Sequence, residues 1–259
     1  METDRIRDRP DRDRELREPR HRRHADDGDF AASLSALAGL ARDGAEVSAH
    51  FCDADSGTTL WSVDDRVVLP IAGLGTVVLL AEVSARMSAD EAFGFELLDK
   101  RKYPPVSGPG LWRSLAVPVL PVSDLAVLVA SVGDAMATNA LLNRVGLDSV
   151  RTRTDVLGLT RTALLDVIRD ERGPDDAPHL AVGTTEDLAV FFGTLARGEV
   201  VDRVTSERVI GWLSRNSDLS LVADAFGLDP HLHGRVGDEL QLINKTGRGP
   251  GVAAEAGVV

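Results

Sequence analysis

One stretch of the sequence constrains the fold more than any other. Residues 72–83, AGLGTVVLLAEV, are apolar on almost every side of a helix. A helix of that kind is buried at the centre of a domain, because no face of it is suited to water. The chain has 259 residues, of which 43% are hydrophobic, so it is long enough to surround this helix with a sizeable core.

Periodicity and turn signals predict the elements on either side of this central helix. A helix is expected from Phe30 to Gly44, and residues 47–52 and 58–63 alternate around a turn, which predicts an antiparallel hairpin. Strands at both ends of the chain with helices between them indicate an α+β fold, with a sheet built from both termini and an all-helical insertion. Further elements are predicted as helices starting at Ser123-Asp124, from Asp134 to Gly146, from Thr184 to Gly198 and over 206–214, and as strands over 240–245 and 252–259.

The first 29 residues differ in composition from the rest of the chain. They are dominated by arginine and acidic residues, and Ile6 and Leu16 are their only large aliphatic side chains. Such a segment cannot offset its ordering entropy by burial, so a disordered tail is expected over 1–29. The remaining domain is predicted as an αβ part over 30–65 and 216–259 and a helical part over 66–215.

The composition also excludes several classes of function. The net charge is −12, and duplex nucleic acid is an unlikely partner for a domain that repels phosphate overall. No membrane-spanning stretch of roughly 18 apolar residues is expected. The N-terminus lacks the pattern of a secretory signal, and a cytoplasmic location is expected.

Metal, cofactor and thiol chemistry find little support in the sequence. Cys52 is the single cysteine, and it is interpreted as a small buried apolar residue of a predicted strand. The segment from Asp229 through His231 and His233, with Asp238 and Glu239 nearby, is interpreted as exposed polar groups of a loop. No metal and no cofactor are therefore predicted.

Four pieces of sequence in a fixed order resemble one known family. They are Tyr103-Pro-Pro-Val-Ser-Gly, Leu120-Pro-Val-Ser-Asp-Leu-Ala, the run from Gly133 to Leu147 and Asn244-Lys-Thr-Gly. In this order and spacing the chain resembles class A β-lactamase-related serine hydrolases over about Phe30 to Val259. The resemblance implies an αβ subdomain, a helical subdomain and an active site in the cleft between them.

The first family motif, Ser-x-x-Lys, is lost. By the resemblance it opens the central helix and supplies a nucleophilic hydroxyl and an amine one turn later. Gly73 occupies the nucleophile position and Thr76 the lysine position. Glycine has no side chain, so no acyl-enzyme is expected there.

The second family motif, Ser-Asp-Asn, is reduced to its central residue. The chain has Gly133-Asp134-Ala135, and both flanking functional groups are absent. Asp134 is interpreted as a helix N-cap, and Asn139 as a structural residue one turn later. Glu171 lies where the family's deacylating glutamate is sought, but it is interpreted as a solvated loop charge and is not assigned a role.

The third family motif survives as Lys245-Thr246-Gly247. In the family this strand faces the cleft and binds the substrate carboxylate through the ammonium and the hydroxyl, and Arg248 adds a second cation. A small carboxylate ligand is therefore the expected partner, with a vestigial strand end as the alternative.

The resemblance also implies two more strands and a covering helix beyond Lys-Thr-Gly, and this sequence stops inside the first of those strands, so the second strand and the helix are expected to be missing. An open sheet edge is expected, and with it self-association. The sequence as a whole predicts a β-lactamase-family pseudoenzyme that binds a carboxylate. Two alternatives stay open, a hydrolase of β-lactams, esters or amides acting through unassigned residues, and an interaction scaffold.

Overall fold

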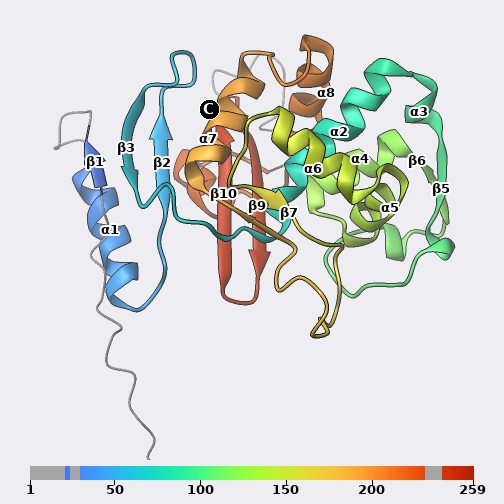
Figure 1. Cartoon of the computed structure of the whole chain (residues 1–259), viewed down its shortest axis with the longest axis horizontal. Coiled ribbons are helices and arrows are strands. Elements are labelled where there is room, and N and C mark those ends of the chain that lie inside the picture. The colour runs from blue at the N-terminus through green and yellow to red at the C-terminus, as the bar shows by residue number, and fades with distance from the viewer. Residues whose placement is uncertain (1–20, 24–29, 231–240) are drawn as a thin grey trace, which may run out of the picture.

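The computed structural model describes residues 21–23, 30–230 and 241–259 of the chain. Figure 1 shows strands from both ends of the sequence on one side of the molecule and a helical region on the other. This is the α+β class that the sequence predicts, but the strands from the two termini form two separate sheets and not the single sheet that was expected.

The N-terminal sheet is built on the predicted hairpin. Phe51 lies opposite Trp61 in antiparallel register, and the register shifts after Phe51. The ring of Phe30, directly before helix α1, packs at 5.6 Å from Phe51 and 5.7 Å from Trp61, so aromatic contacts hold this end of α1 against the sheet. The elements are β1 (His21–Arg23), α1 (Ala31–Arg42), β2 (Ala49–Cys52) and β3 (Thr59–Val63), with strand order β1-β3-β2.

The prediction of a disordered tail over residues 1–29 is wrong for β1. These three residues pair in antiparallel register with Trp61, Ser62 and Val63 of β3. Backbone pairing with an available strand edge does not require apolar side chains, which is why composition failed to indicate it. The other residues of this segment lie outside the part of the chain that the structure describes.

The C-terminal sheet is a second hairpin, β9 (Ile243–Gly249) and β10 (Val252–Val258). Gly251 has φ +70°, a left-handed conformation that glycine adopts without strain, and it allows the tight turn between the two strands. Among the described residues, β2 and β10 each pair with one strand only, so the two terminal sheets are not joined by hydrogen bonds. Helix α7 (Thr185–Ala196) packs against both β2 and β10.

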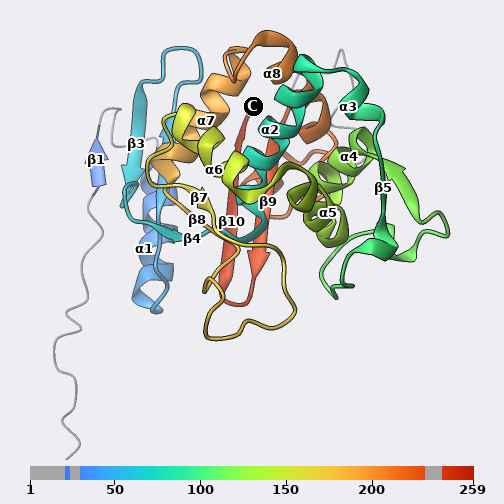
Figure 2. The same cartoon turned by 45° about the vertical axis from the view of Figure 1, so that its right-hand side comes forward.

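The predicted central helix is the core of the domain. A short 3-10 turn, η1 (Ala72–Gly75), leads into α2 (Thr76–Ala89), and residues 77–81 are almost inaccessible to solvent. In Figures 1 and 2 this helix runs through the helical region. It packs against the short helix α3 (Ala92–Phe95) and against four longer helices. They are α4 (Val122–Val132), α5 (Ala135–Val145), α6 (Leu147–Val156) and α8 (Arg203–Leu213).

The segment 72–89 is also long and apolar enough to cross a membrane by length and composition alone, contrary to the expectation from the sequence. In this structure 67% of the segment is buried inside the protein, which is typical of the core helix of a domain.

Two of the three predicted helix caps are confirmed. Asp134 caps α5 by accepting a hydrogen bond from the Ala137 amide, and Thr184 caps α7 by accepting one from the Asp187 amide. The third differs, because α4 begins at Val122 and has no side-chain cap, so Ser123-Asp124 lies within its first turn.

The helical part over 66–215 is not purely helical, which corrects the prediction of an all-helical insertion. It contains two small antiparallel sheets, of order β4-β8-β7 and β5-β6. Strands of two or three residues are too short to show an alternating pattern, so periodicity could not reveal them. The remaining elements are β4 (Leu69–Pro70), α3 (Ala92–Phe95), β5 (Leu97–Asp99), η2 (Lys100–Lys102), η3 (Trp112–Ser114), β6 (Val119–Pro121), β7 (Ala163–Leu164), β8 (Ala181–Gly183) and η4 (Val222–Phe226).

Candidate functional site

The three motif segments converge where η1, the turn before α5 and strand β9 meet. A Cβ atom placed on Gly73 would lie 3.9 Å from the carbonyl oxygen of Thr246. A Cβ atom placed on Gly133 would lie 3.7 Å from the Nζ atom of Lys245. The positions that the sequence singles out therefore form one site.

Gly247 permits the close approach of β9 to η1. A Cβ atom at this position would lie 2.0 Å from the carbonyl oxygen of Ile71 and 2.7 Å from the amide nitrogen of Leu74. Any side chain here would force the strand away from the start of α2. The glycine of the third motif is thus required by packing, whatever ligand the site takes.

The first motif contains neither a nucleophile nor an amine. Gly73 offers only backbone at the nucleophile position, and the Thr76 hydroxyl donates a hydrogen bond to the Gly73 carbonyl over 2.7 Å. Thr76 is buried, and its hydroxyl is satisfied within the turn. Ala72, directly before Gly73, has φ +46°, a left-handed conformation that costs a non-glycine residue roughly 1 kcal/mol.

The second motif is structural at its centre. One Asp134 oxygen accepts from the Ala137 amide at 2.9 Å, and the other accepts from the Leu111 and Trp112 amides at 2.7 Å each. Three amide donors hold this buried carboxylate, so it fixes segment 110–112 against α5. Gly133 has left-handed dihedrals at the end of α4, and Ala135 is buried.

Asn139 joins α5 to the loop that contains Glu171. Its side-chain amide donates to the Ile168 carbonyl and accepts from the Ile168 amide, both over 2.8 Å. This pair of bonds confirms the structural interpretation of Asn139. Glu171 is exposed in the loop, as expected for a solvated charge.

Lys245 is the least satisfied charged group of the site. It is only 3% exposed, and its one hydrogen bond within the described part of the chain runs to the Thr246 carbonyl over 3.5 Å. Burial lowers the pKa of the ammonium to about 8, partly opposed by the negative charge of Asp218. Gly133 places no side chain beside Nζ, so within the described ranges the Thr246 carbonyl and the charge of Asp218 are the groups that act on this ammonium.

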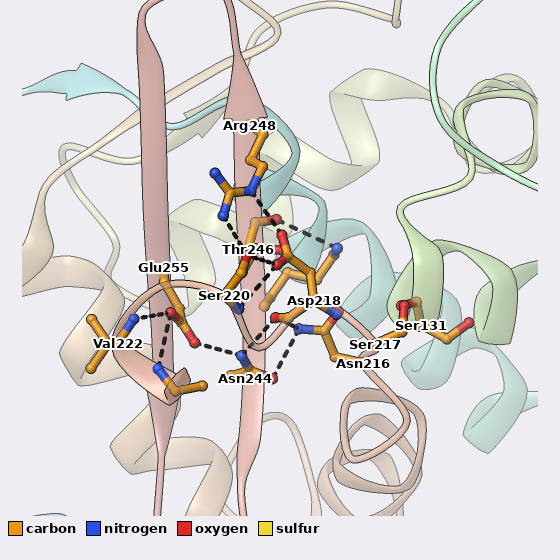
Figure 3. Close-up of polar contacts among 12 residues, drawn as sticks. Ser131, Asn216, Ser217, Asp218, Ser220, Val222, Asn244, Thr246, Arg248 and Glu255 are labelled. Atoms are coloured by element: carbon orange, nitrogen blue, oxygen red, sulfur yellow. Dashed lines mark hydrogen bonds and ion pairs between the residues drawn. The ribbon is translucent and has the colours of Figure 1, made fainter. Parts of the chain in front are cut away.

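Asp218, which sequence reasoning missed, reaches the third motif from the loop after α8. Figure 3 shows it beside Thr246 and Arg248 on β9. Its Oδ2 accepts from Arg248 Nε over 3.0 Å, and Ser220 donates to its other oxygen through both amide and hydroxyl. Burial would raise the pKa of Asp218, but hydrogen bonds from Ser220, Arg248 and the Thr246 side chain hold it at about 2. Arg248 is therefore already paired.

Two buried asparagines fix this loop to the C-terminal hairpin. Asn216 donates to the Asn244 side chain over 2.9 Å, and Asn244 donates to Glu255 of β10 over 2.5 Å. Glu255 in turn accepts from the Val222 amide over 2.6 Å, so the loop is tied at both ends (Figure 3). No local sequence signature links these residues, because the network depends on tertiary placement.

The sequence offers two further candidates, the Cys52 thiol and the segment with His231 and His233. Cys52 is half-buried, and burial followed by the neighbouring Asp53 charge raises its pKa, which disfavours the nucleophilic thiolate. Among the described residues, no group of three or more His, Cys, Asp or Glu side chains could hold a metal ion. His231, His233, Asp238 and Glu239 lie outside those residues.

The depressed pKa of Lys245 predicts a pH dependence of stability. Between about pH 8 and 10.5 the unfolded chain holds a proton on this lysine that the folded protein has lost, so the free energy of unfolding rises with pH. The rise is expected to be on the order of 3 kcal/mol.

Urea unfolding between about pH 8 and 10.5 measures this rise in the free energy of unfolding. Lys245→Met should abolish the rise and Lys102→Met, at an exposed lysine, should retain it, whereas equal slopes in all three proteins would contradict the burial of an ammonium.

Comparison with known proteins identifies the family. Residues 29–259 match the beta-lactamase enzyme family. The fold is similar to a beta-lactamase from Sphaerobacter thermophilus DSM 20745, with 22% identity, a TM-score of 0.75 and coverage of 88% of this chain and 83% of that one. It is also similar to an ancestral class A beta-lactamase, with 20% identity, a TM-score of 0.66 and coverage of 85% and 80%. A third similar structure is that of PBP-A, with 19% identity, a TM-score of 0.65 and coverage of 88% and 80%. No match was found among curated protein sequences. The chain belongs to the beta-lactamase enzyme family.

Proposed function

We propose that this protein is a catalytically deficient member of its family that binds a small carboxylate beside Lys245. The observation that supports the proposal most directly is the contrast between two halves of one site. The Lys245-Thr246-Gly247 strand is packed against the start of α2, while Gly73 at that start has no side chain. A recognition group is retained where the reacting group is missing.

The loss of acyl transfer follows from the residues themselves. An acyl-enzyme needs a nucleophilic side chain and a base to take its proton. Gly73 supplies no nucleophile, and the Thr76 hydroxyl is no base and is bonded to the Gly73 carbonyl. Gly133 and Ala135 also lack the groups that would shuttle a proton or hold a substrate amide. Such groups act as a unit, and loss of the nucleophile alone removes most of the rate.

A lack of space does not explain why position 73 is a glycine. The nearest atom to a Cβ atom placed there is 3.9 Å away, which is an ordinary van der Waals distance. The backbone therefore accommodates a larger residue, and Gly73→Ser is expected to fold.

Carboxylate binding is supported by the state of Lys245. An ammonium that is buried with a single long hydrogen bond gains from an anionic acceptor, because a charge-assisted bond replaces part of its lost hydration. The space beside Nζ on the Gly133 side is where such an oxygen would lie.

Incubation with a penicillin and with an acyl-reactive fluorophosphonate tests the loss of catalysis and the rival hydrolase. Intact-protein mass spectrometry is expected to find no stoichiometric adduct, and hydrolysis of a chromogenic β-lactam is expected not to exceed a buffer control. Gly73→Ser combined with Thr76→Lys is expected to stay inactive, because Gly133 and Ala135 leave the shuttle incomplete. An adduct, or activity that scales with purified protein, would favour a hydrolase acting through other residues.

Acetate binding tests the retained recognition group. Acetate is expected to bind weakly to the wild-type protein, with acetamide as the neutral control. Lys245→Met should weaken binding by about 10- to 100-fold, because it removes a charge-assisted contact. Chemical-shift titration measures both affinities, with Lys102→Met as the matched variant at an exposed lysine. Unchanged affinity in Lys245→Met would mean that the strand end is vestigial.

An interaction scaffold is the second candidate, and we propose self-association through the sheet edges as its basis. It is supported by β2 and β10, each of which has a strand partner on one edge only among the described residues. Unpaired strand edges present backbone donors and acceptors that another chain can use. Light scattering is expected to find oligomers for the full chain and for a form that begins at residue 21, which keeps β1. A sharply unfolding monomer in both would rule out this candidate.

A further inference from the structure

Asp218 lies beside the third motif, where the proposed function places the ligand. Its carboxylate accepts from Arg248 over 3.0 Å and lies beside Thr246, whose side chain lowers the pKa of Asp218 (Figure 3). Its charge also acts on Lys245. An external carboxylate would seek these same partners, namely the two cations and the hydroxyl.

The position of Asp218 is built into the loop. Ser217, its neighbour, donates to the Ser131 carbonyl at the end of α4 through both its amide and its hydroxyl, over 2.9 and 3.0 Å. On the same loop, the buried Asn216 side chain donates to the Asp218 carbonyl over 3.1 Å and to Asn244 of β9 over 2.9 Å. The loop is thus held between α4 and β9 (Figure 3).

We infer that Asp218 is a resident carboxylate that occupies part of the anion site and competes with any external carboxylate for Thr246 and Arg248. The inference rests on the proposed function and specifies how the binding of an external carboxylate is regulated. An intramolecular group held in place has already lost most of its freedom, so it acts at a high effective concentration. External carboxylates then retain the space beside Lys245 but bind weakly until Asp218 is displaced.

This inference predicts two separate effects of Asp218→Asn. The amide keeps the size of the side chain but removes the charge, so Thr246 and Arg248 become available to an external anion. Lys245 loses the nearby negative charge that raises its pKa, so its pKa should fall. The first effect needs a ligand and the second does not.

The 259-residue chain permits both measurements with one label. The sequence contains only three lysines, Lys100, Lys102 and Lys245, so lysine labelled with ¹³C at Cε gives three signals. Lys245→Arg identifies the third signal. Its titration gives the pKa of Lys245, and its shift on addition of acetate gives the affinity, with acetamide as the neutral control.

Asp218→Asn is expected to bind acetate at least tenfold more tightly than the wild-type protein and to lower the Lys245 pKa. Asp224→Asn, at an exposed aspartate of η4, is the matched control and should change neither. Asp218→Ala, which removes the charge without leaving an amide, serves as the second variant if Asp218→Asn unfolds.

The outcomes separate the two proposals. Acetate binding that depends on Lys245 but is not strengthened by loss of the Asp218 charge overturns the resident carboxylate and leaves the proposed function intact. Absence of acetate binding in every variant overturns the proposed function. If no variant binds acetate, the Lys245 pKa still tests the inference. An unchanged pKa in Asp218→Asn overturns it, and a lowered pKa supports Asp218 as the counter-charge of Lys245.

Discussion

The passage of β9 across η1 at Gly247 is the contact on which the rest of the site depends. With a Cβ position 2.0 Å from the Ile71 carbonyl, no other residue fits without moving the strand. This contact joins the C-terminal hairpin to the start of the central helix, two segments about 170 residues apart in sequence. It brings Thr246 over Gly73 and Lys245 beside Gly133, so the packing of the domain and the geometry of the site have one origin.

The sequence predicted those parts of the structure that local chemistry determines. The all-round apolar pattern of 72–83 identified the core helix, and Asp134 and Thr184 were recognised as caps because capping depends on the next three residues. The hairpin of β2 and β3 followed from alternation and a turn. The motif positions were found to share one site because their order matches a known family.

The parts that the sequence missed depend on tertiary placement. Strand β1 exists because β3 offers it an edge, and its own composition gives no sign of it. Asp218 belongs to a loop without a local signature, and only its contact with Arg248, 30 residues later, shows what it does. Arg248 was expected to be an additional cation for a ligand, whereas Asp218 neutralises it.

Hydrogen bonding separates the structural residues of the site from Lys245, the residue that we propose binds a ligand. Asp134 receives three amide donors, and Asn139 and Asn244 are bonded on both sides of their amides, so packing alone accounts for them. Lys245 is different, since its ammonium is buried, makes one long hydrogen bond to the part of the chain that the structure describes, and has a depressed pKa. A cation in that state costs stability unless an anion approaches it, and a methionine would fill the same volume at lower cost. The physical case for the proposed ligand therefore rests on Lys245, and in our proposal Asp218 partly supplies that carboxylate from within the chain.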